Sequence, residues 1–225
     1  MHTLLKFSRC EAVDKLVVVV APEEVLFIKR ALRGVPGLKP YTVVAGGAER
    51  QFSVANGLKA MDPETDLVLV HDAARPLVSP VTIACVIDEA RRSGAAIAAV
   101  REKNTVKVVD SNGIVKKTPE RAQLWEVQTP QGFKREIIEE AYQKAMQDGT
   151  MGTDDASLVE RLGVPVKVVT SDYRNIKITT PEDLLIVEAF LREGRLAKAK
   201  EGIGNVLSDL AAKVEKHMKR QEDKE

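Results

Sequence analysis

Short runs of β-branched residues alternate with amphipathic helical stretches along the chain, up to about residue 190. This alternation is typical of parallel strands joined by crossover helices. We therefore expect an α/β fold in which helices flank a Rossmann-like, mostly parallel sheet. The predicted strands cover residues 16–20, 41–44, 67–71, 95–100, 166–169 and 176–178. The predicted helices cover residues 22–32, 49–61, 80–92, 134–148, 154–162 and 181–192.

Composition limits the classes of protein to which the chain can belong. Its 225 residues, 44% of them hydrophobic, suffice for one substantial core. The 34 Lys and Arg side chains nearly cancel the 33 Asp and Glu side chains, so no general basic field attracts nucleic acid. A signal peptide and a long apolar run are both absent, and the two cysteines suit reduced thiols, so we expect a cytoplasmic protein without membrane partners.

One segment interrupts the alternation of strands and helices. In residues 105–117, TVKVVDSNGIVKK, two strand-like arms flank Asn112-Gly113, a strong signal for a tight hairpin turn. An isolated two-stranded ribbon is only marginally stable in water. We therefore expect this arm, about residues 104–118, to pack on a partner subunit.

Two helices near the carboxyl end are predicted from local chemistry. Thr180 can cap a helix whose first position suits Pro181, and Asp183 complements the positive end of its dipole. Beyond residue 194, apolar residues recur on one face of a second, amphipathic helix. This second helix either docks on the body or on another copy of the chain, or remains a solvated tail.

Two segments place polar residues at the carboxyl ends of predicted strands, where α/β sheets bind ligands. The first, VVAGGAERQFSVANGL, has paired glycines that let a ligand approach the backbone, followed by Ser53 on a helix. The second, LVLVHDAARP, ends a buried strand in Asp72 and brings Arg75 close by. Aspartate suits a metal ion or a ribose hydroxyl, and arginine suits phosphate. The alternatives are an ordinary strand-to-helix turn and a structural Asp72–Arg75 pair with His71 packed behind it.

A further set of polar residues lies at other predicted strand ends and helix starts. Lys177 belongs to a predicted strand with apolar neighbours, where a cation requires an anionic partner. The set indicates an anion-binding site and consists of Arg121, Thr129, Thr153, Asp154, Asp155 and Lys177.

Five segments together resemble one enzyme family. GGAERQFSV, HDAARP, KTPERAQLWEVQTPQGF, TDDASLVE and NIKITTPEDL occur in the order and spacing found in 2-C-methyl-D-erythritol 4-phosphate cytidylyltransferases. The resemblance covers residues from about 2 to 193. Ribitol 5-phosphate cytidylyltransferases usually carry a different pair at Ala73-Ala74, so the sequence favours methylerythritol phosphate.

The resemblance implies that CTP and methylerythritol phosphate react, without a covalent enzyme intermediate, to give pyrophosphate and the cytidine diphosphate adduct. It implies Mg²⁺ near Asp72 and a homodimer joined by the hairpin arm. The implied cytidine contacts are Gly47, Glu49 and Ser53, and Asp72 and Ala73 are implied to lie by the CTP ribose and α-phosphate. Arg75, Thr129 and Lys177 are implied to face the junction of the two substrates. Thr105 and Arg121 are implied to reach the methylerythritol phosphate of the neighbouring subunit, and Thr153 to contact substrate.

The beginning of the chain differs from the family pattern. Family members open with a strand and a glycine-rich loop that holds the triphosphate, whereas Met1 here corresponds to the helix after that loop. We therefore expect a nucleotidyltransferase domain over residues 1–195 without that strand and loop, and a helical extension over 196–225.

The 225-residue chain is expected to release pyrophosphate at least about 10³-fold more slowly than the same chain extended upstream. Two hypotheses remain: a working enzyme whose start lies upstream, and a non-catalytic binding or regulatory protein.

Overall fold

A computed structural model describes residues 1–193 of the chain. The residues divide into two compact units, Met1–Lys177 and a second that begins at Ile178. The predicted domain boundary at 195 and the extension over 196–225 lie outside the described residues. Within the described part, no helix is long and apolar enough to cross a membrane.

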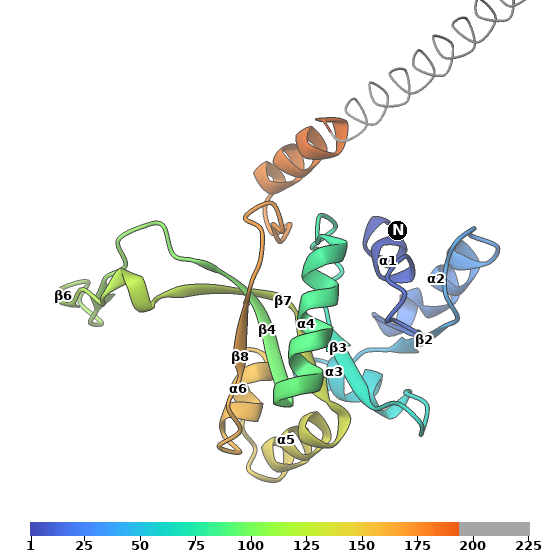
Figure 1. Ribbon diagram of the computed structural model, residues 1–225, viewed down its shortest axis with the longest axis horizontal. Helices are drawn as coiled ribbons and strands as arrows, with labels where there is room; N and C mark the ends of the chain where they lie inside the picture. The colour runs from blue at the N-terminus through green and yellow to red at the C-terminus, as the bar shows by residue number, and fades with distance from the viewer. Residues whose placement is uncertain (194–225) are drawn as a thin grey trace, which may run out of the picture. The chain divides into compact units, whose positions relative to one another are not determined.

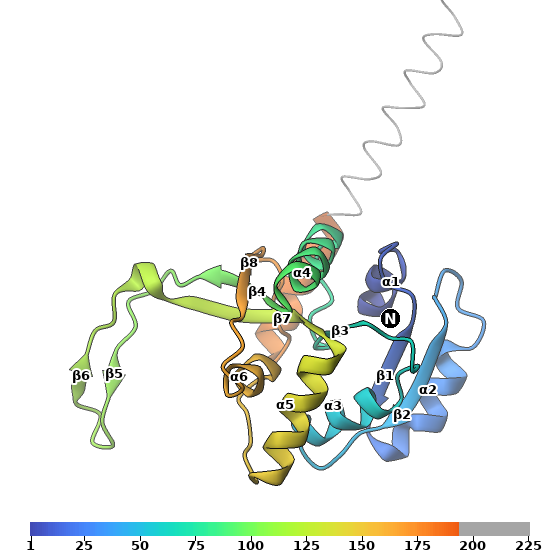
Figure 2. The same ribbon diagram turned by 60° about the horizontal axis from the view of Figure 1, so that its bottom comes forward.

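The larger sheet of the first unit has four strands, in the order β3-β7-β4-β8 (Figures 1 and 2). They are β3 (Leu67–Val70), β7 (Trp125–Lys134), β4 (Ala95–Arg101) and β8 (Lys167–Thr170). Strand β7 is antiparallel to β3 and β4, and β8 is parallel to β4. Three of the four strands therefore run in one direction, as expected for a Rossmann-like α/β fold.

Helices cover both faces of this sheet. They are α4 (Pro80–Ser93) on one face, with α5 (Arg135–Gln147) and α6 (Asp155–Glu160) on the other. Successive side chains of a strand point to opposite faces. Accordingly, Ala96 and Ala98 pack with α4, whereas Ala95 and Ile97 pack in the cluster formed by α5 and α6. Burial on both faces explains why β4 is apolar without alternation.

A smaller parallel sheet pairs β1 (Leu16–Val20) with β2 (Tyr41–Ala45). The helical elements of this region are α1 (His2–Ser8), η1 (Pro22–Glu24), α2 (Val25–Leu32) and α3 (Arg50–Lys59). Phe7 of α1 and Leu16 of β1 belong to the same buried cluster as Ile83 of α4. This cluster joins the amino-terminal elements to the larger sheet.

The hairpin arm consists of β5 (Val108–Val109) and β6 (Val115–Lys117), followed by the short helix η2 (Arg121–Gln123). Figures 1 and 2 both show it projecting away from the helices that cover the larger sheet. Asp110 closes the turn by accepting hydrogen bonds from the N–H groups of Asn112 and Ile114, at 3.0 and 2.9 Å. Gly113 adopts a positive φ of 78°, which a glycine tolerates without strain. The predicted hairpin is therefore confirmed.

Most predicted elements are confirmed, but the final predicted strand is wrong. Residues 176–178 form no strand. The backbone N–H and carbonyl of the preceding Asn175 are already hydrogen-bonded, one within a turn and the other to a side chain. The N–H of Asn175 donates to the carbonyl of Asp172 at 3.0 Å, and its carbonyl accepts from Arg75 at 2.8 Å. Lys177 consequently follows an irregular loop and its side chain is 43% exposed.

The sequence reasoning also missed β7, the longest strand of the larger sheet. Pro130 and Gly132 lie inside β7, and both residue types normally count against a strand. Pairing with β3 on one side and with β4 on the other overrides that composition. The register with β4 shifts between Ile97 and Ala99, near Pro130.

The second unit begins a helix at Pro181, which continues to the end of the described residues. The Thr180 hydroxyl accepts from the N–H of Asp183 at 3.4 Å, and the Asp183 carboxylate accepts from the N–H of Thr180 at 2.9 Å. This reciprocal cap confirms the predicted start of the helix.

Candidate active site

Asp72 follows the carboxyl end of β3 and lies beside three basic side chains. Lys177 Nζ and Arg75 Nε lie 3.2 and 3.4 Å from its Oδ2, and Arg50 Nε lies 3.8 Å from its Oδ1. Burial raises the pKa of the Asp72 carboxyl, but the charge and hydrogen bond of Lys177, with the charges of Arg50 and Arg75, outweigh burial and lower it. The carboxylate is therefore held ionised amid an excess of positive charge.

Thr129 and His71 orient the backbone of this cluster. The Thr129 hydroxyl accepts from the N–H of Asp72 at 3.0 Å and lies 3.0 Å from His71 Nδ1. His71 Nε2 faces the carbonyl of Arg75 at 3.3 Å, and a carbonyl can only accept. Burial lowers the pKa of His71 to about 4, so the ring is neutral at pH 7, with its proton on Nε2. These contacts are those of a buried histidine that supports the backbone of the cluster.

The glycine turn lies between β2 and α3. Its backbone is held by Ser53, whose hydroxyl accepts from the N–H of Gly47 at 3.0 Å and donates to the carbonyl of Glu49 at 3.1 Å. A Cβ at Gly47 would lie 2.4 Å from that of Phe52, so the turn requires a glycine there. The Glu49 side chain is exposed and makes no capping bond with α3. Because Arg50 follows directly and approaches Asp72, the turn lies beside the basic cluster.

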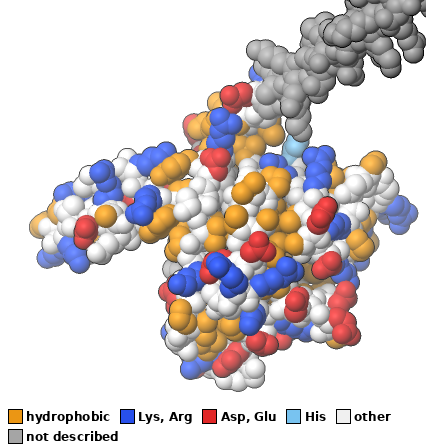
Figure 3. Space-filling view, viewed as in Figure 1, with side chains coloured by type: hydrophobic (Ala, Val, Ile, Leu, Met, Phe, Trp, Pro, Cys, Tyr) orange, Lys and Arg blue, Asp and Glu red, His pale blue; other side chains and the backbone are white. Residues whose placement is uncertain are grey.

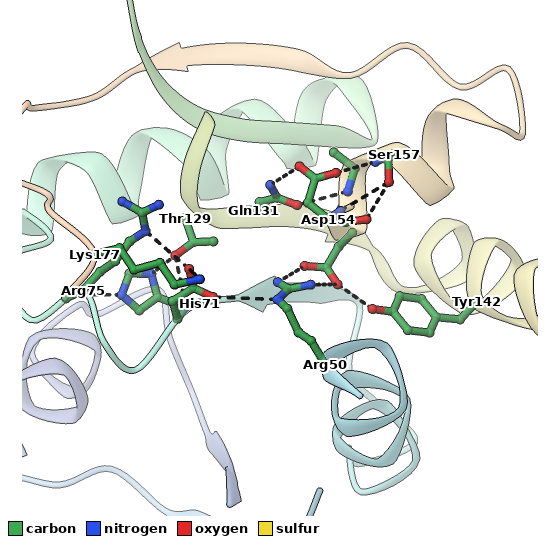
Figure 4. A network of polar contacts seen from close by, with 12 residues as sticks. Arg50, His71, Arg75, Thr129, Gln131, Tyr142, Asp154, Ser157 and Lys177 are labelled. Carbon is green, nitrogen blue, oxygen red and sulfur yellow. Dashed lines mark hydrogen bonds and ion pairs between the residues drawn. The ribbon is translucent and has the colours of Figure 1, made fainter. Parts of the chain in front are cut away.

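Arg50 also connects this cluster to a buried acidic residue. Its guanidinium binds both carboxylate oxygens of Asp155, at 3.1 and 2.6 Å, and Tyr142 donates to the same carboxylate at 2.5 Å. The Asp155 side chain is 0% exposed. Figure 4 shows Lys177, Arg75, Thr129 and His71 gathered together, with Arg50 between that group and Tyr142. Helices α3, α5 and α6 are thereby joined at the edge of the site.

Comparison with known proteins identifies the family to which the chain belongs. The family model described as 2-C-methyl-D-erythritol 4-phosphate cytidylyltransferase matches residues 1–193. The chain belongs to this cytidylyltransferase family. It is therefore a nucleotidyltransferase.

Curated relatives and solved structures agree with the family assignment. A 2-C-methyl-D-erythritol 4-phosphate cytidylyltransferase of Syntrophus aciditrophicus is 48% identical over 204 residues, covering 87% of this chain and 85% of the relative. That of Caldanaerobacter subterraneus is 44% identical over 193 residues, covering 85% of each. The 4-diphosphocytidyl-2C-methyl-D-erythritol synthase structure from Anaerococcus prevotii matches with a TM-score of 0.80 at 36% identity, covering 85% of this chain and 84% of that one.

Three of the remaining predicted residues of this cytidylyltransferase belong to other segments, and Ala73 directly follows Asp72. Thr105 and Arg121 belong to the arm region, where Arg121 donates to the carbonyl of Lys103 at 3.1 Å. Thr153 is exposed directly before Asp154, which caps α6. Ala73 is exposed, and its carbonyl accepts from the Thr3 hydroxyl at 2.8 Å. The structure thus brings together Asp72, Arg75, Thr129 and Lys177, with the glycine turn next to them.

Sequence reasoning missed the pairing of Arg50 with Asp155 in this cytidylyltransferase. Both residues lie in quoted motifs, but 105 positions separate them and no local pattern relates them. Gln51 strengthens the same connection, since its amide donates to the carbonyl of Thr150 at 3.0 Å and accepts from the N–H of Gly152 at 2.8 Å. The start of α3 therefore holds the segment that precedes α6.

Proposed function

We propose that this chain transfers the cytidylyl group of CTP to 2-C-methyl-D-erythritol 4-phosphate, in the non-mevalonate route to isoprenoid precursors. A phosphate oxygen of the acceptor attacks the α-phosphorus of CTP. The bond from that phosphorus to the oxygen bridging the α- and β-phosphates breaks, and pyrophosphate leaves with the electron pair. Family membership supports this reaction, and the relatives named above favour methylerythritol phosphate over ribitol 5-phosphate.

The cluster around Asp72 is the observation that carries the proposal. Phosphoryl-group transfer depends on positioning and on neutralising charge at the reacting phosphate. Lys177 and Arg75 both contact Oδ2 of Asp72. The Thr129 hydroxyl accepts a hydrogen bond from the backbone N–H of Asp72. We assign Lys177, Arg75 and Thr129 to the junction of the two substrates, with Lys177 stabilising the α-phosphate.

The glycine turn is assigned to the cytidine of CTP. Gly47 has no side chain, and its backbone N–H is oriented by Ser53. A nucleotide can therefore approach the main chain here, with Glu49 and Ser53 as polar neighbours. Asp72 and Ala73 are assigned to the ribose and α-phosphate, because they follow the carboxyl end of strand β3.

We propose that Asp72 supplies the protein carboxylate for a magnesium ion that the substrate helps to hold. Among residues 1–193, no group of three or more His, Cys, Asp or Glu side chains could hold a metal ion. Mg²⁺ commonly uses one or two carboxylates together with substrate phosphates and water. Asp72 is the carboxylate assigned to it, and the ion would neutralise phosphate charge.

The arm is assigned to dimerisation and to the second substrate. Some hydrophobic side chains are exposed on the arm, at the left of Figure 3. The exposed large hydrophobic residues of the arm are Val106, Val108, Val109, Ile114 and Val115. Burying them against a second copy removes apolar surface from water. Thr105 and Arg121, near the base of the arm, are assigned to the methylerythritol phosphate bound by the neighbouring subunit. Thr153 is assigned to substrate binding. The homodimer is assigned to the cytoplasm.

A direct assay tests the proposed reaction. The chain is supplied with Mg²⁺, CTP and either methylerythritol phosphate or ribitol 5-phosphate, and pyrophosphate release is measured. We expect release that depends on both substrates and favours methylerythritol phosphate. Tight binding of CTP without pyrophosphate release, in the chain and in an upstream-extended form, would instead support a non-catalytic binding protein.

Deleting residues 107–116 and joining Val106 to Lys117 is expected to convert dimers into monomers while the sheets stay folded. The deletion removes the strands of the arm and most of its exposed apolar surface. Sedimentation velocity measures the change. The matched control is Lys116→Ala, which removes only an exposed ion pair to Asp110 at 3.1 Å and should leave the dimer intact. A deletion variant that remains dimeric contradicts the assignment.

A further inference from the structure

We propose that Asn175 is a positioning residue that holds Lys177 and Arg75 in place around Asp72. The inference rests on the role proposed above for Lys177, and it concerns the loop of residues 171–177 that follows β8. Asn175 is 0% exposed, although asparagine is usually found at the surface.

The side chain of Asn175 anchors the loop to β7. Its amide nitrogen donates to the side-chain carbonyl of Gln128 at 2.9 Å and to the backbone carbonyl of Thr129 at 2.8 Å. Gln128 returns a bond to the loop, since its own amide donates to the carbonyl of Asp172 at 3.4 Å. The loop is therefore bound to the residue whose hydroxyl orients Asp72.

The backbone of Asn175 fixes the geometry of the basic cluster. Its carbonyl accepts from Arg75 Nη1 at 2.8 Å, while Arg75 Nε contacts Asp72 at 3.4 Å. Its N–H closes a turn onto Asp172, whose carboxylate also accepts from the N–H of Arg174 at 2.8 Å. Lys177 follows two residues later, within about 7 Å along an extended chain. Displacement of Asn175 would therefore move both cations.

The unpartnered atom of Asn175 shows which half of the amide matters. Its Oδ1 is buried and accepts no hydrogen bond from the described residues. A buried acceptor without a partner is unfavourable, and an apolar side chain would avoid it. Rotating the amide would point this oxygen at two carbonyl oxygens, so the two acceptors determine its orientation. The function of Asn175 thus resides in the two N–H groups that hold the loop.

A double-mutant cycle tests the inference. Asn175→Ala is made in the unmodified chain and in Lys177→Ala, and kcat and KM are measured for all four proteins. We expect Asn175→Ala alone to lower kcat by about 10- to 100-fold, the scale of a misplacement of about 1 Å. In the Lys177→Ala background, Asn175→Ala should lower kcat by a clearly smaller factor, because one of the two cations that it positions is already absent and only Arg75 remains to be displaced. Ser171→Ala is the control in the same loop, since its buried hydroxyl makes no hydrogen bond within the described residues.

The outcomes separate the two proposals. Equal losses of kcat in both backgrounds would show a general structural role and overturn the inference, while leaving the role of Lys177 intact. A near-normal kcat for Lys177→Ala would instead overturn the assignment of Lys177 itself, and the inference with it. If Asn175→Ala does not fold, hydrogen exchange of the unmodified chain decides. The side-chain NH2 of Asn175 should exchange its hydrogens much more slowly than the side-chain NH2 of the exposed Asn112. Equal exchange rates would overturn the inference.

Discussion

Replacing Lys177 by alanine is expected to lower kcat by about 10²-fold or more, about 3 kcal/mol, with a much smaller effect on binding of methylerythritol phosphate. Lys177 Nζ lies 3.2 Å from Asp72, at the carboxyl end of β3. In the proposed reaction, a cation held there would stabilise the reacting α-phosphate more in the transition state than in the ground state. Steady-state kinetics with separate determination of kcat and KM measures the effect.

Two further variants make the Lys177 result specific. Lys177→Arg keeps the charge but changes its shape, so it should recover only part of the lost rate. Lys116→Ala removes an exposed lysine from the arm and should change kcat little. Near-normal turnover of Lys177→Ala would assign this lysine to an ion pair with Asp72 and remove it from the reaction.

Replacing Arg50 by alanine is expected to lower the free energy of unfolding by about 3 kcal/mol, because it leaves a buried carboxylate without its cation. Asp155 is 0% exposed and receives two of its hydrogen bonds from Arg50. The expected loss of unfolding free energy lies at the lower end of the range usual for breaking a buried ion pair. The Arg50 side chain is 39% exposed, so water can reach the vacated space. Urea unfolding at pH 7 measures the change.

The control for Arg50 replaces both partners. Asp155→Asn removes the charge that Arg50→Ala leaves unpaired, so the double variant should be more stable than Arg50→Ala alone. Tyr142→Phe removes only the hydroxyl bond and should cost less, about 1.5–3 kcal/mol. Destabilisation of the double variant by the sum of the two single effects would show that the ion pair is not the origin of the loss.

Local patterns predicted several elements closely. The run Leu16–Val20 is a strand as predicted, and Thr180 caps its helix, because apolar periodicity and capping depend on residues near one another in the chain. The proximity of Asp72 and Arg75 was predicted for the same reason, since they are three positions apart after a strand end. Thr129 and Lys177 were predicted as members of an anion-binding set from their places at strand ends and helix starts, and the resemblance to the family added their place at the substrate junction.

Strand β7 and the loop before Lys177 were decided by tertiary contacts. Pro130 and Gly132 argue locally against a strand, yet two neighbouring strands satisfy the backbone of β7. The alternating pattern Ile-Lys-Ile at residues 176–178 argues locally for a strand, yet Arg75 and Asp172 bind the backbone groups of Asn175. In both places, the hydrogen-bond partners of the backbone lie outside the window in which a local pattern is read.

The amino-acid sequence by itself determined the α/β class, most element positions and the family, because these depend on periodicity, capping and the order of motifs. Only the tertiary structure paired Arg50 with Asp155 and Asn175 with Gln128, residues 105 and 47 positions apart. Such pairs depend on the path of the intervening chain. A buried polar group requires a hydrogen-bond partner, and here the partner lies far away in the sequence. Local periodicity therefore does not predict which residue it is.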